Sequence, residues 1–172
     1  MIKEELIARA DKIIEEIETA PLYEFDPGYN GRYGTVGGYF ASYARKKDLN
    51  GCFNRRGFLT DSIRDSRRPI LILYGHDFNQ VLGIVTRIEE RQTGLYMRGE
   101  YFNTPRAQEV RKLVSMGGIC QMSFKAVPLY DEEDPVQLSE NETARLRPIS
   151  ELIEISLTTE PAQPMSIITE YT

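Results

Sequence analysis

The chain contains three residues whose types can together perform nucleophilic chemistry: His76, Ser123 and Glu154. A serine hydroxyl can attack a carbonyl carbon, an imidazole can accept the hydroxyl proton, and a carboxylate can fix the tautomer of the imidazole. Histidine suits the role of base because its unperturbed pKa lies near neutrality. His76 is the only histidine in the 172 residues, so an imidazole base in this chain would have to be His76.

All three residues fall in or next to segments that are predicted to be strands. The apolar run at residues 70–74 is typical of a buried strand, and Gly75 ends it directly before His76. Side chains alternate between the two faces of a strand. Within the predicted strand at residues 119–127, this alternation places Ser123 on the face opposite the apolar one.

The last strand pattern covers residues 148–160. Alternation places Glu154 on one face together with Ser156. The other face is expected to be the apolar one, formed by Ile149, Glu151, Ile153, Ile155 and Leu157. A carboxylate in the middle of such a strand needs a partner if it is shielded from water.

Each of these residues also has an ordinary structural interpretation, and the pattern alone leaves both interpretations open. A lone histidine is commonly a surface or hydrogen-bonded residue, and Ser123 and Glu154 can be polar groups on a solvated face. Ser123 lies in the sequence QMSFK rather than in a G-x-S-x-G elbow. Asp77 is a poor alternative to Glu154, because adjacent residues of an extended chain point in opposite directions. Cys120 shares the apolar parity of its strand and is expected to be buried rather than nucleophilic.

The composition is that of a globular protein, with 41% hydrophobic and 27% charged residues. A net charge of -5 argues against a nucleic-acid partner, which needs clustered Lys and Arg. No apolar run approaches the roughly 20 residues of a membrane-spanning helix, so no membrane partner is expected. One histidine and two cysteines, Cys52 and Cys120, supply too few ligands for a metal site. We therefore expect neither metal nor cofactor, and a reducing compartment.

An amphipathic helix is predicted at residues 2–19. Its apolar stripe consists of Leu6, Ile7, Ala10, Ile13, Ile14 and Ile17. This stripe is expected to pack on the same domain or on a partner chain. The chain is thus predicted to comprise an N-terminal helix, residues 1–20, and a single β-barrel domain, residues 21–172.

The rest of the chain is predicted to form mainly strands. Residues 81–90 and 95–102 alternate and predict a β-hairpin. A helix is predicted at 103–118, and the acidic, polar residues 131–147 predict a mobile loop. Short strands in consecutive order with few helices favour an antiparallel barrel or sandwich, which is a mainly β fold with peripheral helices.

In order and spacing, these segments resemble the tailed-phage prohead proteases, which are capsid-maturation serine proteases. The resemblance rests on GYFASYARKKDLNG, LILYGHDFNQVLGIV with its Gly83, GLYMRGEYF, SMGGICQMSFKAV and ELIEISLTTEPAQP. It covers roughly residues 37–165, which is most of the chain.

This family is distantly similar to the herpesvirus assemblins, which implies an antiparallel β-barrel with peripheral helices. The resemblance implies that Ser123 is the nucleophile, His76 the general base and Glu154 the third member. In assemblins the third residue is a second histidine, which this chain lacks, so an acidic third member or a dyad is implied. Assemblins place arginines near the oxyanion site, and Arg145 or Arg147 is available for that role here.

The implied function is a phage or prophage prohead maturation endopeptidase with a Ser-His-Glu mechanism. It would cleave the major capsid protein or scaffold, and itself, inside the assembling prohead in the cytoplasm of the bacterial host. A homo-oligomer is compatible with this role. The alternative is a non-catalytic β-barrel that binds capsid or scaffold protein during assembly, which the first helix and the acidic segment suit equally well. A third interpretation, a Cys120 hydrolase, requires the opposite face of the strand.

Overall fold

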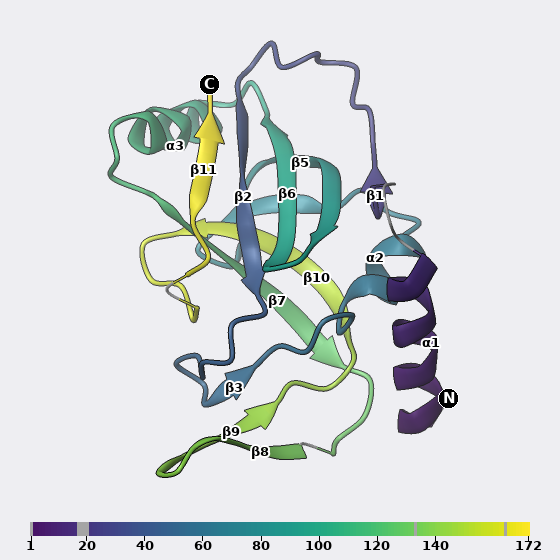
Figure 1. Cartoon of the computed structure of the whole chain (residues 1–172). Helices are drawn as coiled ribbons and strands as arrows, with labels where there is room; N and C mark the ends of the chain where they lie inside the picture. The colour runs from purple at the N-terminus through teal and green to yellow at the C-terminus, as the bar shows by residue number, and fades with distance from the viewer. Residues whose placement is uncertain (1, 17–20, 133, 164) are drawn as a thin grey trace.

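The structure of the chain is a computed structural model, and it describes residues 2–16, 21–132, 134–163 and 165–172. Within these residues strands predominate, and the helices lie at the periphery (Figure 1). In chain order the elements are α1 (Lys3–Glu16), β1 (Tyr23–Glu24), β2 (Thr35–Ser42), β3 (Cys52–Phe53), α2 (Thr60–Arg64), β4 (Leu71–Tyr74), β5 (Asp77–Arg91), β6 (Gly94–Tyr101), α3 (Pro105–Ser115), β7 (Gln121–Pro128), β8 (Asp134–Ser139), β9 (Glu142–Leu146), β10 (Ser150–Thr158) and β11 (Ile168–Tyr171). The predicted fold class is confirmed.

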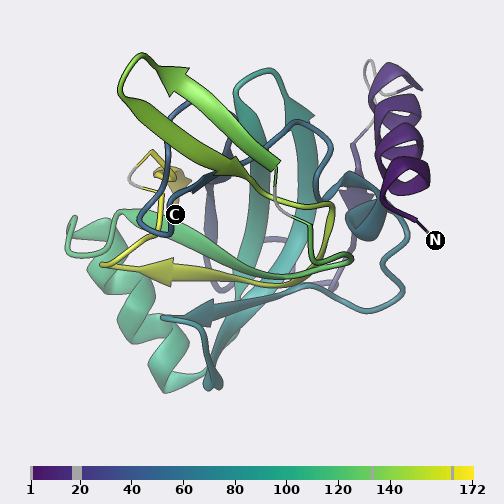
Figure 2. The same cartoon turned by 90° about the horizontal axis from the view of Figure 1, so that it is seen from below.

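The main sheet has the strand order β11-β2-β6-β5-β4-β10-β7, and β1 pairs with β5. The sheet curls into a partial barrel (Figures 1 and 2). Its two end strands approach each other where the amide of Met122 donates to the carbonyl of Ser166, and the amide of Ile168 donates to that of Cys120, both at 2.9 Å. Most neighbouring strands are antiparallel, but β4 and β10 run parallel. A second, smaller sheet has the order β3-β9-β8.

The core fills the concave side of the curled sheet, because alternate residues of each strand point inward. Fully buried core side chains come from five strands of the sheet: Phe40, Ile72, Met97, Met122 and Ile155. These apolar contacts hold β4, β7 and β10 in place, and those are the strands that carry or directly precede the candidate site residues.

Helix α1 packs on its own chain, beside α2 (Figure 1). Leu6, Ala10 and Ile13 are buried, and Leu6 and Ala10 belong to the main core cluster. Ile17, the last residue of the predicted stripe, lies outside the described residues. The division of the chain into residues 1–20 and 21–172 remains a prediction.

The prediction of a mobile loop at residues 131–147 is wrong. Strands β8 and β9 form an antiparallel hairpin there, and β9 also pairs in parallel with β3. Exposure alternates along β8, and Ala144 of β9 is buried. The loop was predicted from the acidic and polar composition of the segment. The alternation of its side chains with a period of two is the feature that indicates a strand.

The predicted apolar face of the last strand is correct at Ile149, which is buried just before β10, and in the second half of β10, but not between them. The pairing of β10 with β7 shifts between Leu152 and Glu154, so that Ile153 has no counterpart on β7. Ile155 and Leu157 point into the core as predicted, whereas Ile153 and Glu151 are exposed. A β-bulge of this kind inserts one residue and reverses the alternation beyond it.

Gly83 occupies a position where β5 and β6 approach closely, opposite Tyr101. A Cβ atom added to Gly83 would lie 2.1 Å from the carbonyl oxygen of Glu100, which is a backbone atom. The sheet cannot relieve that overlap without shifting β6. A glycine is therefore required at this position for steric reasons.

We expect Gly83→Ala to lower the free energy of unfolding by about 3 kcal/mol, the upper part of the range for overpacking a rigid site. Urea denaturation of the purified variant measures this loss. Gly118→Ala is the matched control, because a Cβ there would meet the carbonyl oxygen of Leu113 at 3.5 Å, an ordinary contact. Equal stability of the two variants would contradict the steric requirement.

Candidate active site

His76 lies in the two-residue turn that joins β4 to β5. Tyr74 pairs with Asp77 across this turn, and Gly75 and His76 both have positive φ angles, 56° and 63°. Positive φ at both central residues is typical of the tight turns that match the twist of a hairpin. Histidine is among the residues that adopt this conformation more readily than most other non-glycine residues.

Two backbone hydrogen bonds tie the turn to β10. The amide of Gly75 donates to the carbonyl of Leu157 at 3.0 Å, and the amide of His76 donates to the hydroxyl of Ser156 at 3.0 Å. The left-handed conformation is therefore held by the neighbouring strand, and it places the imidazole over β10 and β7.

The register of β10 against β7 brings the other two predicted residues together. Ser123 lies directly opposite Ser156, and Lys125 lies opposite Glu154. Residues that are opposite each other share a face of the sheet, so Ser123, Glu154 and Ser156 lie on one face. That face is the convex one, away from the core residues Met122 and Ile155.

The three predicted residues form one continuous hydrogen-bonded chain. The Nε2 atom of His76 lies 3.1 Å from the hydroxyl of Ser123, and its Nδ1 atom contacts Oε1 of Glu154. The Nε2–hydroxyl separation is within the reach expected of a nucleophile and its base. The carboxylate accepts a hydrogen bond from the protonated Nδ1 atom. The unprotonated Nε2 atom can therefore accept the proton of the Ser123 hydroxyl.

Burial differs along this chain of residues in a way that suits a reactive site. The side chain of Glu154 is 0% exposed, whereas that of His76 is 37% exposed and Ser123 is 6% exposed. A buried carboxylate is stable only when its oxygens are hydrogen-bonded. The second oxygen of Glu154 accepts a hydrogen bond from the hydroxyl of Ser156 at 2.5 Å. The carboxylate is thus held from both sides, while the imidazole remains accessible.

Asp77 does not take part in this network. Its carboxylate accepts hydrogen bonds from the side chain of Gln80 at 2.9 Å and from the amide of Asn79 at 2.8 Å. The hydrogen bonds from the side chain of Gln80 and the amide of Asn79 lower the pKa of Asp77. The carboxylate of Asp77 is therefore bonded to the first residues of β5, whereas the imidazole contacts Glu154.

The expected burial of Cys120 is wrong, because this residue is exposed. It precedes β7, where the carbonyl of Cys120 accepts a hydrogen bond from Ile168 and the alternation of the strand has not yet begun. The imidazole of His76 is hydrogen-bonded to Ser123 rather than to this thiol.

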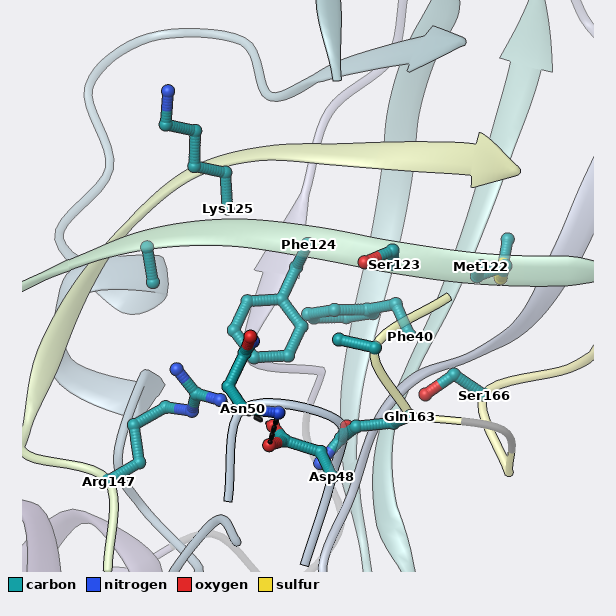
Figure 3. A pocket seen from close by; sticks show the side chains of 12 residues that line it. Phe40, Asp48, Asn50, Met122, Ser123, Phe124, Lys125, Arg147, Gln163 and Ser166 are labelled. Atoms are coloured by element: carbon teal, nitrogen blue, oxygen red, sulfur yellow. Dashed lines mark hydrogen bonds and ion pairs between the residues drawn. The ribbon is translucent and has the colours of Figure 1, made fainter. Parts of the chain in front are cut away.

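A pocket of about 160 Å³ adjoins Ser123 on the other side of β7 (Figure 3). Arg147 lines it, and its guanidinium pairs with Asp48 at 2.6 Å and donates to the side chain of Asn54 at 2.9 Å. Arg145 lies outside this lining and donates to the carbonyl of Asn50 at 2.6 Å. Of the two candidate arginines, Arg147 is therefore the one at the pocket, and its charge is balanced by Asp48.

Sequence reasoning missed Ser156 as a member of the site. Its hydroxyl accepts from the His76 amide and donates to the Glu154 carboxylate, so it links the turn to the acid. One signal was available: Ser156 has the same strand parity as Glu154. Its position opposite Ser123 is set by strand pairing, which the sequence did not reveal.

The model of the caudovirus prohead serine protease family matches residues 23–171. The match extends over most of the chain, and the chain therefore belongs to this family of serine peptidases. No curated protein matches the chain.

Similar solved structures include the protease of Kaposi's sarcoma-associated herpesvirus in complex with a hexapeptide phosphonate inhibitor. It has a TM-score of 0.50 and 14% identity, and the match covers 81% of this chain and 64% of the herpesvirus chain. A structure of the same viral protease with an allosteric inhibitor has a TM-score of 0.44 and 13% identity over 81% of this chain and 75% of that one. At such identity the likeness shows the fold alone, which is that of the assemblin proteases.

We expect Ser156→Ala to slow the reaction of Ser123 with a fluorophosphonate by about tenfold to a hundredfold. A hydrogen bond to a charged group contributes about 1.5–3 kcal/mol, and a loss of about 1.4 kcal/mol corresponds to a tenfold change in rate. The dependence of the labelling rate on probe concentration should show a lower limiting rate with an unchanged half-saturating concentration.

Ser150→Ala provides the matched control for this experiment. Ser150 is also buried on β10, but its hydroxyl donates to the carbonyl of Pro148. Equal labelling rates for the Ser156→Ala and Ser150→Ala variants would show that Ser156 does not position the reactive groups.

Proposed function

We propose that this chain is the maturation endopeptidase of a phage or prophage prohead, and that it works by a Ser-His-Glu mechanism. The observation that carries the proposal is the hydrogen-bonded series Ser123–His76–Glu154, drawn from three separate parts of the chain. Membership of the prohead serine protease family supports the same reading.

In the proposed mechanism, the hydroxyl of Ser123 attacks the carbonyl carbon of the scissile peptide bond. Nε2 of His76 takes the hydroxyl proton and passes it to the leaving amine, which departs as the acyl-enzyme forms. Water, deprotonated by the same imidazole, then releases the acyl group and restores Ser123. Glu154 keeps the proton on Nδ1 and stabilises the imidazolium that exists between these transfers.

The buried position of Glu154 strengthens this effect. A carboxylate that is shielded from water interacts more strongly with a neighbouring positive charge than an exposed one does. The hydroxyl of Ser156 holds the second carboxylate oxygen, so Glu154 is oriented toward Nδ1 before any charge develops. Preorganisation of this kind requires no rearrangement during the reaction.

The proposed substrates are the major capsid protein or scaffold of the assembling prohead, and the chain itself. The proposed location is the interior of the prohead in the bacterial host cytoplasm, and a homo-oligomer is compatible with it. The family description supports these assignments at the level of the prohead. None of the helices that the structure describes is long and apolar enough to cross a membrane.

We expect Ser123→Ala to abolish processing of a capsid precursor that is co-expressed with the chain. The substitution removes the oxygen atom that forms the acyl-enzyme in the proposed mechanism, so the residual rate should be lower by at least about 10³-fold. Gel electrophoresis and intact mass of the precursor measure processing. Unchanged processing would refute the assignment of Ser123.

A labelling experiment distinguishes the protease from the alternative, a non-catalytic capsid- or scaffold-binding module. Treatment of the wild-type chain with a fluorophosphonate, in the presence of assembling capsid protein, should label Ser123 and no other serine. A chain that assembles with capsid protein but leaves both precursor and probe untouched would support the binding module.

We expect Glu154→Gln to slow fluorophosphonate labelling by about 10³- to 10⁴-fold, because a carboxamide cannot stabilise the imidazolium and can favour the wrong tautomer. Glu151→Gln is the control, since Glu151 is an exposed residue on the same strand. A loss below about tenfold for Glu154→Gln would indicate a Ser-His dyad instead.

A further inference from the structure

The pocket beside Ser123 lies between β7 and two connecting segments (Figure 3). One edge of β7 pairs with β10 along its whole length. On the other edge, the amide of Met122 is bonded to the carbonyl of Ser166. Ser123 and Ser166 both line the pocket, so the pocket adjoins the proposed nucleophile.

The pocket is lined by a buried hydroxyl group, that of Ser166. Ser166 is 0% exposed, and its Oγ atom has no hydrogen-bond partner within the part of the chain that the structure describes. Its side chain points into the pocket, toward the space between Phe40 and Gln163 (Figure 3). An unpaired buried hydroxyl destabilises a fold by about 1–3 kcal/mol, so its presence in a pocket indicates a group that is bonded only when a ligand is bound.

A carboxamide lies close to this hydroxyl. Gln163 is buried, and its Oε1 atom accepts a hydrogen bond from the amide of Ser42 at 3.1 Å. Because this bond assigns the carbonyl oxygen to Ser42, the NH₂ group is the part of Gln163 that remains as a donor for a ligand. Together, Ser166 offers a donor and an acceptor, and Gln163 offers a donor.

Of the three charged residues that line the pocket, Asp48 and Arg147 neutralise each other, and the side chain of Lys125 points away from the pocket (Figure 3). Asp48 and Arg147 form an ion pair at 2.6 Å, and Asp48 also accepts hydrogen bonds from the amides of Asn50 and Cys52. A charged ligand group would enter without a free counter-charge, and burial of an unpaired charge is strongly unfavourable. A purely apolar group would leave the hydroxyl of Ser166 unpaired.

The size of the pocket sets a further limit. Its volume is about 160 Å³, and a water molecule takes about 30 Å³ in the liquid, so about five non-hydrogen atoms fit. Phe40 and Phe124 supply apolar walls, with their rings in an edge-to-face contact at 6.3 Å. These walls suit the methylene groups of a side chain whose polar end reaches Ser166.

We propose that this pocket receives the substrate side chain on the N-terminal side of the scissile bond, and that Ser166 and Gln163 select an uncharged carboxamide, glutamine or asparagine, at that position. This inference rests on the proposed function, because it assumes that Ser123 is the nucleophile. Ser166 and Gln163 are then specificity-determining residues, which contact the substrate but take no part in proton transfer.

The experiment uses peptidyl diphenyl phosphonates, which place a chosen side chain next to the reacting phosphorus. Ser123 Oγ forms a bond to phosphorus and one phenoxide leaves, taking up the proton from the hydroxyl. The full chain is treated with two probes that differ only in this side chain, glutamine or the apolar, unbranched norleucine. Intact mass spectrometry gives the rate of inactivation.

We expect the glutamine probe to react at least about tenfold faster than the norleucine probe, because a site built for hydrogen bonds rejects an analogue that lacks them. In Ser166→Ala this ratio should fall to about one to threefold. A fluorophosphonate, which lacks a peptide side chain, should still label Ser123 in that variant. The melting temperature should be unchanged or higher, because Ser166 Oγ makes no hydrogen bond to any of the described residues.

Ser115→Ala is the matched control, since Ser115 is exposed at the end of α3 and donates to the carbonyl of Lys112. It should retain the wild-type ratio. A norleucine probe that reacts as fast as the glutamine probe, or a ratio unchanged by Ser166→Ala, would overturn the inference while fluorophosphonate labelling of Ser123 leaves the proposed function standing. A wild-type chain that reacts with no phosphorus probe at all would overturn both.

Discussion

The site depends on the pairing of β7 with β10, and in particular on the irregularity in that pairing between Leu152 and Glu154. Leu152 lies opposite Ala126, and both pack toward the core. With strict alternation Glu154 would have the same orientation as Leu152 and would carry its carboxylate into the apolar interior. The extra residue reverses the alternation, so Glu154 joins Ser123 on the convex face. A slip of one residue in a strand moves all of its side chains to the other face, and a bulge achieves that reversal for half of β10.

The turn at His76 is the second constraint, and it depends on the first. A non-glycine residue with positive φ is uncommon and persists where the surrounding structure holds it. Here Ser156 supplies that support, because its hydroxyl bonds both the amide of His76 and the carboxylate of Glu154. One buried hydroxyl thus couples the conformation of the turn to the position of the acid. The three candidate site residues thus share the convex face of the sheet, and the pocket adjoins Ser123 at the edge of β7 that does not pair with β10.

Much of the candidate site could be predicted from the sequence. The features that could not be predicted depend on where strands begin and on how they pair. The choice of His76 as the candidate base followed from there being one histidine, and the order of apolar runs indicated the strands that carry Ser123 and Glu154. The burial of Cys120 was predicted wrongly, because parity holds only inside a strand and β7 begins one residue later. The β8–β9 hairpin was missed because the loop prediction was based on the acidic composition of the segment and not on its alternating side chains. Gln163 and Ser166 gave no signal, since they lie in a connection whose course depends on how the ends of the sheet meet.

The sequence by itself determined the residue types available for chemistry, the mainly β fold class and the resemblance to prohead proteases. These follow from local information: side-chain chemistry, hydrophobic periodicity and the order of segments. Only the tertiary structure decided that β4 runs parallel to β10, that a bulge turns Glu154 outward and that Ser156 joins the hydrogen-bonded network. Each of these depends on which strands become neighbours and in what register. That choice is made by the packing of the whole core, through contacts between residues far apart in the chain, and no single segment encodes it.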